Sequence, residues 1–319
     1  MRPLVSFVVP VKNDAQRLRR CLTRILANDY PRELIEIIVV DNESTDGSGR
    51  VAREHGAVVL RAGGDRVAEL RNRGARAALG TIIAFADADH EVDSHWIQSA
   101  VDVLADASVA ATGAPYSADP GANWVQQQYD GFRERLDHRQ EVTWLGSGNF
   151  AVKRWSFERV GGFNAALTAC EDVDLCNRLR LAGHRIVADP GLRSVHYGDP
   201  KTLKALFLGE LWRGRDNLRV TFSGPRTLRN WRSGLIPIAQ LAALAAGAGA
   251  LIAGMLPVAL ICWLTAVAPA LARAALVIRR RIRPTFVAAV QAVTVSIVFD
   301  LARAFALLTR GSHRARRSA

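Results

Sequence analysis

The stretch GTIIAFADADH, residues 80–90, joins a short apolar run to two aspartates that follow it directly. The apolar part has the length and composition of a buried β-strand. Asp87 and Asp89 stand where that strand should leave the core. Paired carboxylates at such a point fit three structures: a turn, a solvated strand end, or a site that binds a hard cation such as Mg²⁺ or Mn²⁺. The surrounding pattern decides between them.

The first hundred residues repeat this apolar pattern. The runs VSFVVPV (5–11), IEIIVVD (35–41) and AVVLRAG (57–63) also have the composition of buried strands, and segments of helical periodicity separate them. In the first such segment, one helical face carries Leu18, Cys21, Leu22 and Ile25. Short apolar strands that alternate with amphipathic helices indicate a mainly parallel α/β sheet with helices on both faces.

Three of the predicted strands end in polar residues: PVKND (10–14), VVDNESTD (39–46) and FADADH (85–90). In an open parallel sheet, ligands bind beyond the carboxyl ends of the strands, so these three ends should open into one crevice. Asp41 could accept hydrogen bonds from a ribose or a base. The alternative is that STDGS (44–48) is an ordinary capping loop.

A second informative block covers residues 146–186. It begins with GSGNFAVKR, which is typical of a strand, and contains EDVDLCNRLRLAG, which is typical of an amphipathic helix. Glu171 and Asp172 occupy the start of that helix, where the helix dipole stabilises carboxylates. They fit simple capping, or one of them is a general base. A base would also need burial, since the dipole alone lowers its pKa.

His196 follows another strand-like run and fits either a structural role or a metal ligand. The other histidines show no ligand spacing, and no role is assigned to His55, His90, His95, His138, His184 and His313. The four cysteines are scattered without a zinc-binding spacing and are expected to be reduced thiols.

The formal net charge of +12 is unevenly distributed. Up to Trp212 the chain has 26 Lys and Arg against 28 Asp and Glu, whereas from Arg213 onward it has 16 Arg and only two acidic residues. The basic character therefore belongs to the C-terminal part. This distribution argues against nucleic acid as a partner and favours anionic lipid headgroups.

Residues 234–272 contain no charged side chain. Because one membrane span needs about 20 apolar residues, the run is long enough for two, at about 234–254 and 258–278, with the turn near Gly254 and Pro257. A buried pair of soluble helices is the alternative. A third segment, 285–308, carries Asp300 and Arg303. It is expected to lie along the interface, or else to span with those two residues paired.

Arginines flank the apolar run, and the chain ends in the basic tail RGSHRARRS (310–318). Both features predict cytoplasmic ends. The N-terminus lacks the pattern of a signal peptide, so the front domain is expected in the cytoplasm. The sequence thus predicts a catalytic domain at 1–225 and a membrane region at 226–319.

Taken in order, these motifs resemble family 2 glycosyltransferases, which have the GT-A fold. The resemblance rests on VVPVKND, VVDNESTDGS, LRNRGARAALGTIIAFADAD, GSGNFAVKR, VGGF and CEDVDLCNRLRLAGHRI, and it runs from Ser6 to His196, about three-fifths of the chain. It implies an inverting transfer of a sugar from a nucleotide-diphosphate donor. Together with the apolar tail, it favours a lipid-linked or cell-envelope glycan acceptor.

The resemblance also assigns roles to particular residues. Asp172 is implied as the catalytic base, and a divalent metal, Mg²⁺ or Mn²⁺, is implied at Asp87 and Asp89 with help from His196. The implied donor-binding residues are Pro10, Val11, Asn13, Asp41, Asn72, Asp87 and Asp89. The acceptor-side candidates are Glu171, Trp212 and Arg213.

One departure from the family concerns processive synthases, whose Gln-x-x-Arg-Trp motif is replaced here by GELWRGRDNLR (209–219). That favours the addition of one or a few sugars. Two other functions remain open on the sequence alone. The first is nucleotidyl transfer, which would release pyrophosphate and is disfavoured because the first strand lacks a glycine-rich phosphate loop. The second is a non-catalytic membrane scaffold, against which the intact Asp87, Asp89 and Asp172 argue.

Overall fold

The computed structural model describes residues 2–225, 228–280 and 285–309. The chain forms two compact units. The first contains Met1–Asp119 and Arg133–Gly198, and the second contains Pro120–Phe132 and Asp199–Ala319. A short central segment of the sequence therefore belongs with the C-terminal helices.

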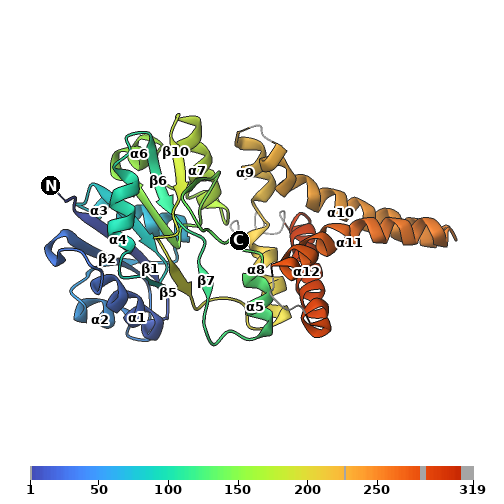
Figure 1. Ribbon diagram of the computed structural model, residues 1–319, viewed down its shortest axis with the longest axis horizontal. Coiled ribbons are helices and arrows are strands. Elements are labelled where there is room, and N and C mark those ends of the chain that lie inside the picture. The colour runs from blue at the N-terminus through green and yellow to red at the C-terminus, as the bar shows by residue number, and fades with distance from the viewer. Residues whose placement is uncertain (1, 226–227, 281–284, 310–319) are drawn as a thin grey trace, which may run out of the picture. The chain divides into compact units, whose positions relative to one another are not determined.

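An eight-stranded sheet forms the centre of the first unit (Figure 1). Strands β1, β2, β3 and β4 are parallel neighbours, and β6 and β10 are parallel to each other. Strand β9 lies antiparallel between β4 and β6, and β8 is antiparallel to β10. The predicted mainly parallel α/β sheet is therefore confirmed. In spatial order the strands are β3 (Val58–Ala62), β2 (Ile35–Asn42), β1 (Val5–Val11), β4 (Ile82–Ala86), β9 (Asn149–Lys153), β6 (Val109–Gly113), β10 (Arg185–Ala188) and β8 (Gln140–Glu141).

Helices cover both faces of this sheet. Helices α1 (Ala15–Leu26), α2 (Ser48–Glu54) and α4 (Trp96–Leu104) pack on one face, and α3 (Val67–Ala77), α6 (Arg154–Arg159) and α7 (Glu171–Leu181) pack on the other. A short 3₁₀ helix, η1 (Arg32–Leu34), precedes β2. The four residues predicted to form the buried face of α1 are all fully buried, as expected: Leu18, Cys21, Leu22 and Ile25.

A close approach of α3 to β1 depends on Gly74. A Cβ at this position would collide with the side chain of Val8 in β1 and press on Val40 in β2. The absence of a side chain thus lets the helix lie directly on the sheet, where packing is as dense as in a molecular crystal. This contact sets the position of α3, which carries a residue of the site described below.

A smaller sheet of three strands positions the histidines. It consists of β5 (His90–Val92), β11 (Ser194–His196) and β7 (Ser117–Ala118) in the order β5-β11-β7. Strands β5 and β11 are antiparallel, and their register places His90 directly opposite His196. Because β5 begins just after the DAD segment, this sheet brings two imidazoles to the aspartates.

The second unit is helical. It consists of α5 (Trp124–Asp130), α8 (Leu203–Arg213), α9 (Asn217–Ser223), α10 (Leu228–Ile252), α11 (Leu256–Arg279) and α12 (Phe286–Ala306). Helix α5 packs against α12, and α12 also packs against α8. Their apolar contact is formed by Val125, Leu206 and Val295.

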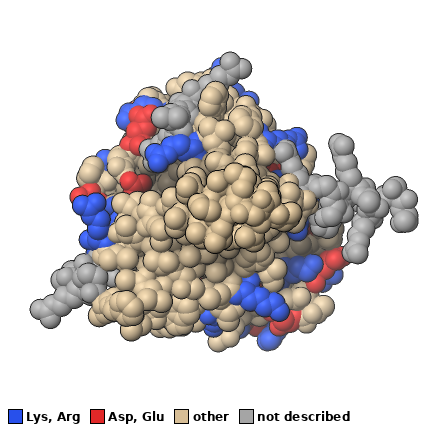
Figure 2. All heavy atoms as spheres, turned by 90° about the vertical axis from the view of Figure 1, so that its right-hand side faces the viewer, with Lys and Arg blue, Asp and Glu red and all other residues tan. Residues whose placement is uncertain are grey.

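Three helices of this unit are long and apolar enough to cross a membrane: Trp231–Ile252, Leu256–Arg279 and Phe286–Ala306. Gly254 adopts a left-handed φ of 75° in the turn between the first two, and Pro257 lies in the first turn of α11. Figure 2 shows a broad surface free of Lys, Arg, Asp and Glu on the side of α10 and α11. The third segment is thus a 21-residue helix that meets the same length and composition criterion as the other two.

Asp300 and Arg303 are not paired with each other in the way suggested for a spanning third helix. Asp300 accepts a hydrogen bond from Arg273 of α11 at 2.8 Å, while Arg303 donates to Glu210 of α8 at 2.7 Å. Both residues find partners on neighbouring helices instead of each other, because α12 packs against α8 and α11. The arginine run at 281–283 and the basic tail at 310–318 lie outside the described residues.

Candidate active site

The loops that follow β1 and β2 interlock at the carboxyl edge of the large sheet. The side-chain oxygen of Asn13 accepts a hydrogen bond from the Thr45 backbone at 2.8 Å, and Asp46 accepts one from the Ala15 backbone at 2.8 Å. Asn13 adopts a left-handed φ of 52°, which asparagine tolerates better than most residues. The two predicted loops thus form one rim, with Asn13 exposed on it.

Other predicted donor-binding residues lie at the same edge. Pro10 and Val11 are buried at the end of β1, and Val11 pairs in register with Asp41 of β2. Asp41 accepts a hydrogen bond from the backbone of Ser44 at 2.9 Å. Asn72 instead donates to and accepts from the backbone of Phe163, at 2.7 and 2.8 Å. Contacts of these residues with a donor stay predictions.

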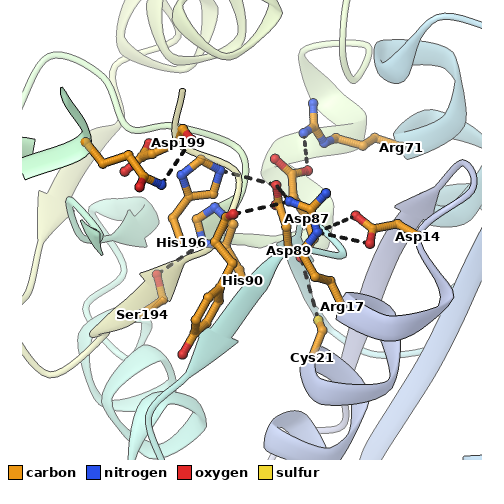
Figure 3. Close-up of polar contacts among 12 residues, drawn as sticks. Asp14, Arg17, Cys21, Arg71, Asp87, Asp89, His90, Ser194, His196 and Asp199 are labelled. Atoms are coloured by element: carbon orange, nitrogen blue, oxygen red, sulfur yellow. Dashed lines mark hydrogen bonds and ion pairs between the residues drawn. The ribbon is translucent and has the colours of Figure 1, made fainter. Parts of the chain in front are cut away.

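Asp89, His90 and His196 form a cluster of metal-binding side chains (Figure 3). One ligand atom from each lies within 4.8 Å of the others. His196 Nε2 lies 3.3 Å from Asp89 Oδ2, and His90 Nδ1 lies 3.2 Å from the hydroxyl of Ser194. One carboxylate and two imidazoles form a donor set that first-row divalent metals accept.

Two glycines keep this cluster open. A Cβ at Gly198 would collide with Asp89 Oδ2 and lie 2.8 Å from His196 Nε2, and a Cβ at Gly148 would lie 2.6 Å from Asp87 Oδ2 and 3.0 Å from His90 Nε2. A side chain at either position would therefore crowd a ligand atom of the cluster. The donor set and the room that the two glycines leave beside it fit a divalent cation.

The pKa shifts of Asp89 and His90 also suit a cation. Burial raises the pKa of Asp89, but the hydrogen bond and charge of His196 outweigh it, so the pKa of Asp89 lies below its usual range. Burial and the neighbouring His196 lower the pKa of His90 to about 4. A deprotonated carboxylate and a neutral imidazole are the forms that bind metals.

Arg71 of α3 connects two predicted acidic residues. Its guanidinium donates to Asp87 Oδ1 at 2.6 Å and to Glu171 Oε1 at 2.8 Å. Arg71 is 3% exposed, so both pairs are shielded from bulk water on the arginine side. Asp87 is thus held by an arginine, while Asp89 lies in the histidine cluster.

Asp172 lies next to Glu171 in the first turn of α7 and has a different environment. It is partly buried, and its Oδ1 accepts a hydrogen bond from the backbone of Val173 at 2.8 Å. Burial, followed by repulsion from Glu171, raises the pKa of Asp172 to about 7. The sequence alone predicted that a general base at the start of this helix would need burial to raise its pKa, and Asp172 has that burial.

Two predicted acceptor-side residues belong to the second unit. Trp212 is exposed on α8, and Arg213 donates to Glu210 at 3.0 Å. Their role stays a prediction.

Sequence reasoning assigned no role to three residues that line the site. His90 completes the cation cluster, Arg71 bridges Asp87 and Glu171, and Arg17 lies 3.7 Å from Asp89 while its Nε pairs with Asp14 at 2.9 Å. For Arg71, the sequence signal was its place in the motif LRNRG (70–74), which is part of the family resemblance. The pairing of His90 with His196 depends on sheet register and left no sequence pattern.

The sequence profile of glycosyl transferase family 2 matches residues 6–162, just under half of the chain. The chain is 26% identical over 210 residues to glycosyltransferase AglE of Haloferax volcanii, across 62% of this chain and 68% of that protein. It is 30% identical over 203 residues to the pre-mycofactocin glycosyltransferase of Mycobacterium tuberculosis, across 58% of this chain but only 41% of that protein.

Solved structures show the same fold. The mannosyltransferase PcManGT from Pyrobaculum calidifontis, in complex with GDP-Man and Mn²⁺, aligns with a TM-score of 0.61 and 20% identity, across 96% of this chain and 87% of that one. GalNAc-T7 with UDP, GalNAc and Mn²⁺ aligns with a TM-score of 0.51 and 18% identity, across 66% and 48%. The predicted family and GT-A fold are therefore confirmed.

Proposed function

We propose that this protein is a membrane-anchored inverting glycosyltransferase that transfers a sugar from a nucleotide diphosphate to a hydroxyl of a lipid-linked or cell-envelope glycan. The observation that carries the proposal is that one unit contains both a cluster of side chains that could hold a metal ion and a partly buried carboxyl group. The cluster is Asp89, His90 and His196, and the carboxyl is Asp172. A GT-A sheet with both features suits sugar transfer from a diphosphate.

The proposed cofactor is a divalent cation held by Asp89, His90 and His196. When bound, the cation offsets the negative charge that develops on the departing diphosphate. Two imidazoles in the donor set favour Mn²⁺ over Mg²⁺, because Mg²⁺ prefers oxygen ligands and water. The Mn²⁺ in the PcManGT complex supports this choice.

Asp172 is the proposed proton acceptor. A carboxylate with a pKa near 7 accepts a proton from the acceptor hydroxyl more readily than an ordinary aspartate does. The hydroxyl oxygen then attacks the anomeric carbon as the bond to the diphosphate oxygen breaks, and the configuration inverts. Arg17, next to Asp89, supplies a positive charge that favours the diphosphate.

The nucleotide is proposed to bind at the rim formed by Asn13 and Asp41. The three apolar helices support an anchor, and the arginines flanking them support a cytoplasmic catalytic domain. The domain boundary proposed from the sequence, with catalysis at 1–225 and anchoring at 226–319, remains part of this proposal.

The donor is tested by a thermal-shift screen of the purified full chain with UDP-, dTDP- and GDP-sugars, each with and without Mn²⁺. GDP-mannose is a good first choice because PcManGT was solved with it. We expect a nucleotide sugar to raise the melting temperature only with the metal. The released product separates the two transferase mechanisms: a nucleoside diphosphate supports sugar transfer, and pyrophosphate would contradict it.

A further inference from the structure

Arg71 is a buried, positively charged side chain of the site. Its guanidinium reaches Asp87, at the end of β4, with Nη2 and Glu171, at the start of α7, with Nη1. The side chain of Arg71 is 4% exposed, and its plane lies near the ring of Phe163, 5.7 Å from the ring centroid. The two ion pairs and the ring of Phe163 thus hold the guanidinium between two acidic segments.

Four carboxylates lie in this part of the site, and their partners differ. Two are paired with Arg71: Asp87 and Glu171. The other two are Asp89, which pairs with His196, and Asp172, which accepts only a backbone hydrogen bond among the contacts recorded for it. A carboxylate oxygen that already accepts a charge-assisted hydrogen bond from an arginine is engaged and is not available to another partner at that position.

We propose that Arg71 is a positioning residue that divides these carboxylates between two tasks. By holding Asp87 and Glu171, it leaves Asp89 to the cation and Asp172 to the acceptor hydroxyl. It also links Asp87, at the end of β4, to Glu171, the residue that precedes the proposed base. The inference rests on the proposed function, since it takes Asp172 to be the base.

The charge balance around Asp172 gives this role a measurable consequence. The largest charge effects on Asp172 come from Glu171 of its own helix and from Arg71 of α3, and the thiol of Cys176 is a further titratable group near it. Arg71 lowers the proton affinity of Asp172 directly, and it also offsets the repulsion from Glu171. Its loss should therefore raise the pKa of Asp172, whereas loss of the Glu171 charge should lower it.

The test is labelling of Asp172 with dicyclohexylcarbodiimide in the purified full chain, quantified by peptide mass spectrometry across a pH series. This reagent modifies a carboxyl only in its protonated form, so the labelling midpoint reports the pKa without any substrate. We expect Arg71→Met to raise the midpoint by about one unit, Arg71→Lys to restore most of it, and Glu171→Gln to lower it by a similar amount.

Arg178→Met is the matched control, because Arg178 pairs with Asp174 of the same helix and not with Glu171. It should leave the Asp172 midpoint unchanged. If Arg71→Met does not fold, Arg71→Gln takes its place, because it removes the charge but keeps a hydrogen-bond donor for the two carboxylates. An unchanged Asp172 midpoint in the folded variants would overturn the proposal. Because the measurement needs no donor, it stays informative even if no nucleotide sugar is turned over, which would contradict the proposed function instead.

Discussion

The imidazole Nε2 of His196 lies 3.3 Å from the Oδ2 of Asp89. The two residues come from the two separate sequence segments of the first unit. They meet because β11 pairs with β5, the strand that follows the DAD segment. His90 joins them from the paired position on β5. The candidate cation site thus depends on the small sheet and not on the DAD segment alone.

The glycine beside this pair gives the first prediction. Gly198→Ala should lower the affinity for Mn²⁺ by about 10- to 100-fold, because the added methyl group would collide with Asp89 Oδ2. Isothermal titration of the purified protein with Mn²⁺ measures this effect. Gly249→Ala is the control, since no atom lies within 4 Å of a Cβ there. Equal Mn²⁺ affinity in both variants would contradict the assigned site.

The second prediction concerns pH. Asp172 must be deprotonated to accept the hydroxyl proton, and its pKa is raised to about 7. The turnover rate should therefore be highest above pH 7 and fall as the pH drops below it, approaching about tenfold per unit. Rates at saturating donor and acceptor, measured from pH 5 to 9, check this. A rate that stays constant down to pH 5 would show that a group of ordinary carboxylate pKa, or none, limits the reaction.

Glu210 gives a prediction about stability. Its carboxylate is fully buried and accepts hydrogen bonds from Tyr129, Arg213 and Arg303. Burial raises the pKa of Glu210, but the two arginines outweigh burial, and its pKa lies below the usual range. Glu210→Gln should destabilise the helical unit by about 2 kcal/mol, because it removes the buried carboxylate charge that pairs with Arg213 and Arg303, whose side chains are partly exposed.

The melting temperature of the purified protein measures this loss. The control is Glu158→Gln, which removes a 60% exposed side chain that lies 3.6 Å from Arg154. Exposed ion pairs contribute little, so this variant should melt close to the wild type. Similar melting temperatures for the two variants would mean that the Glu210 cluster is not important for stability.

The anchor is tested with two arginine substitutions at equally exposed positions. Ile261 in α11 is 64% exposed, and Leu181 at the end of α7 is 63% exposed. Arginine costs roughly 2.5–3.5 kcal/mol at the centre of a span and less toward its ends, and Ile261 lies in the first half of α11. Ile261→Arg should therefore reduce the fraction of the protein that stays in membranes after alkaline extraction, and Leu181→Arg should not. Equal retention would argue that α11 does not cross the bilayer.

Local patterns in the sequence predicted much of the first unit. Strand β1 and the buried face of α1 follow from the apolar spacing that places Leu18 and Leu22 in the core, and the loop after β4 follows from the aspartates at its end. These features depend on neighbours within a few residues. The resemblance also assigned roles to Asp89, His196 and Asp172, which lie in motifs, and these roles stay predictions.

Long-range pairing was the part that local patterns could not reveal. His90 lies opposite His196 only through the register of β5 and β11, and Arg71 resembles any other helical arginine until the fold places it between Asp87 and Glu171. Likewise, Asp300 pairs with Arg273 of another helix and not with its near neighbour Arg303. Each of these contacts depends on how separate elements pack.

The most direct measurement compares Asp172→Asn with the wild type and with Asp174→Asn, a variant of the neighbouring acid that pairs with Arg178. Formation of the nucleoside diphosphate is followed with the donor found in the screen, and Mn²⁺-dependent binding of that nucleotide is measured in parallel. We predict that Asp172→Asn lowers the transfer rate by about 10²- to 10⁴-fold while nucleotide binding is unchanged, and that Asp174→Asn stays within a few-fold of the wild type. Full transfer activity in Asp172→Asn would contradict the assignment of the base.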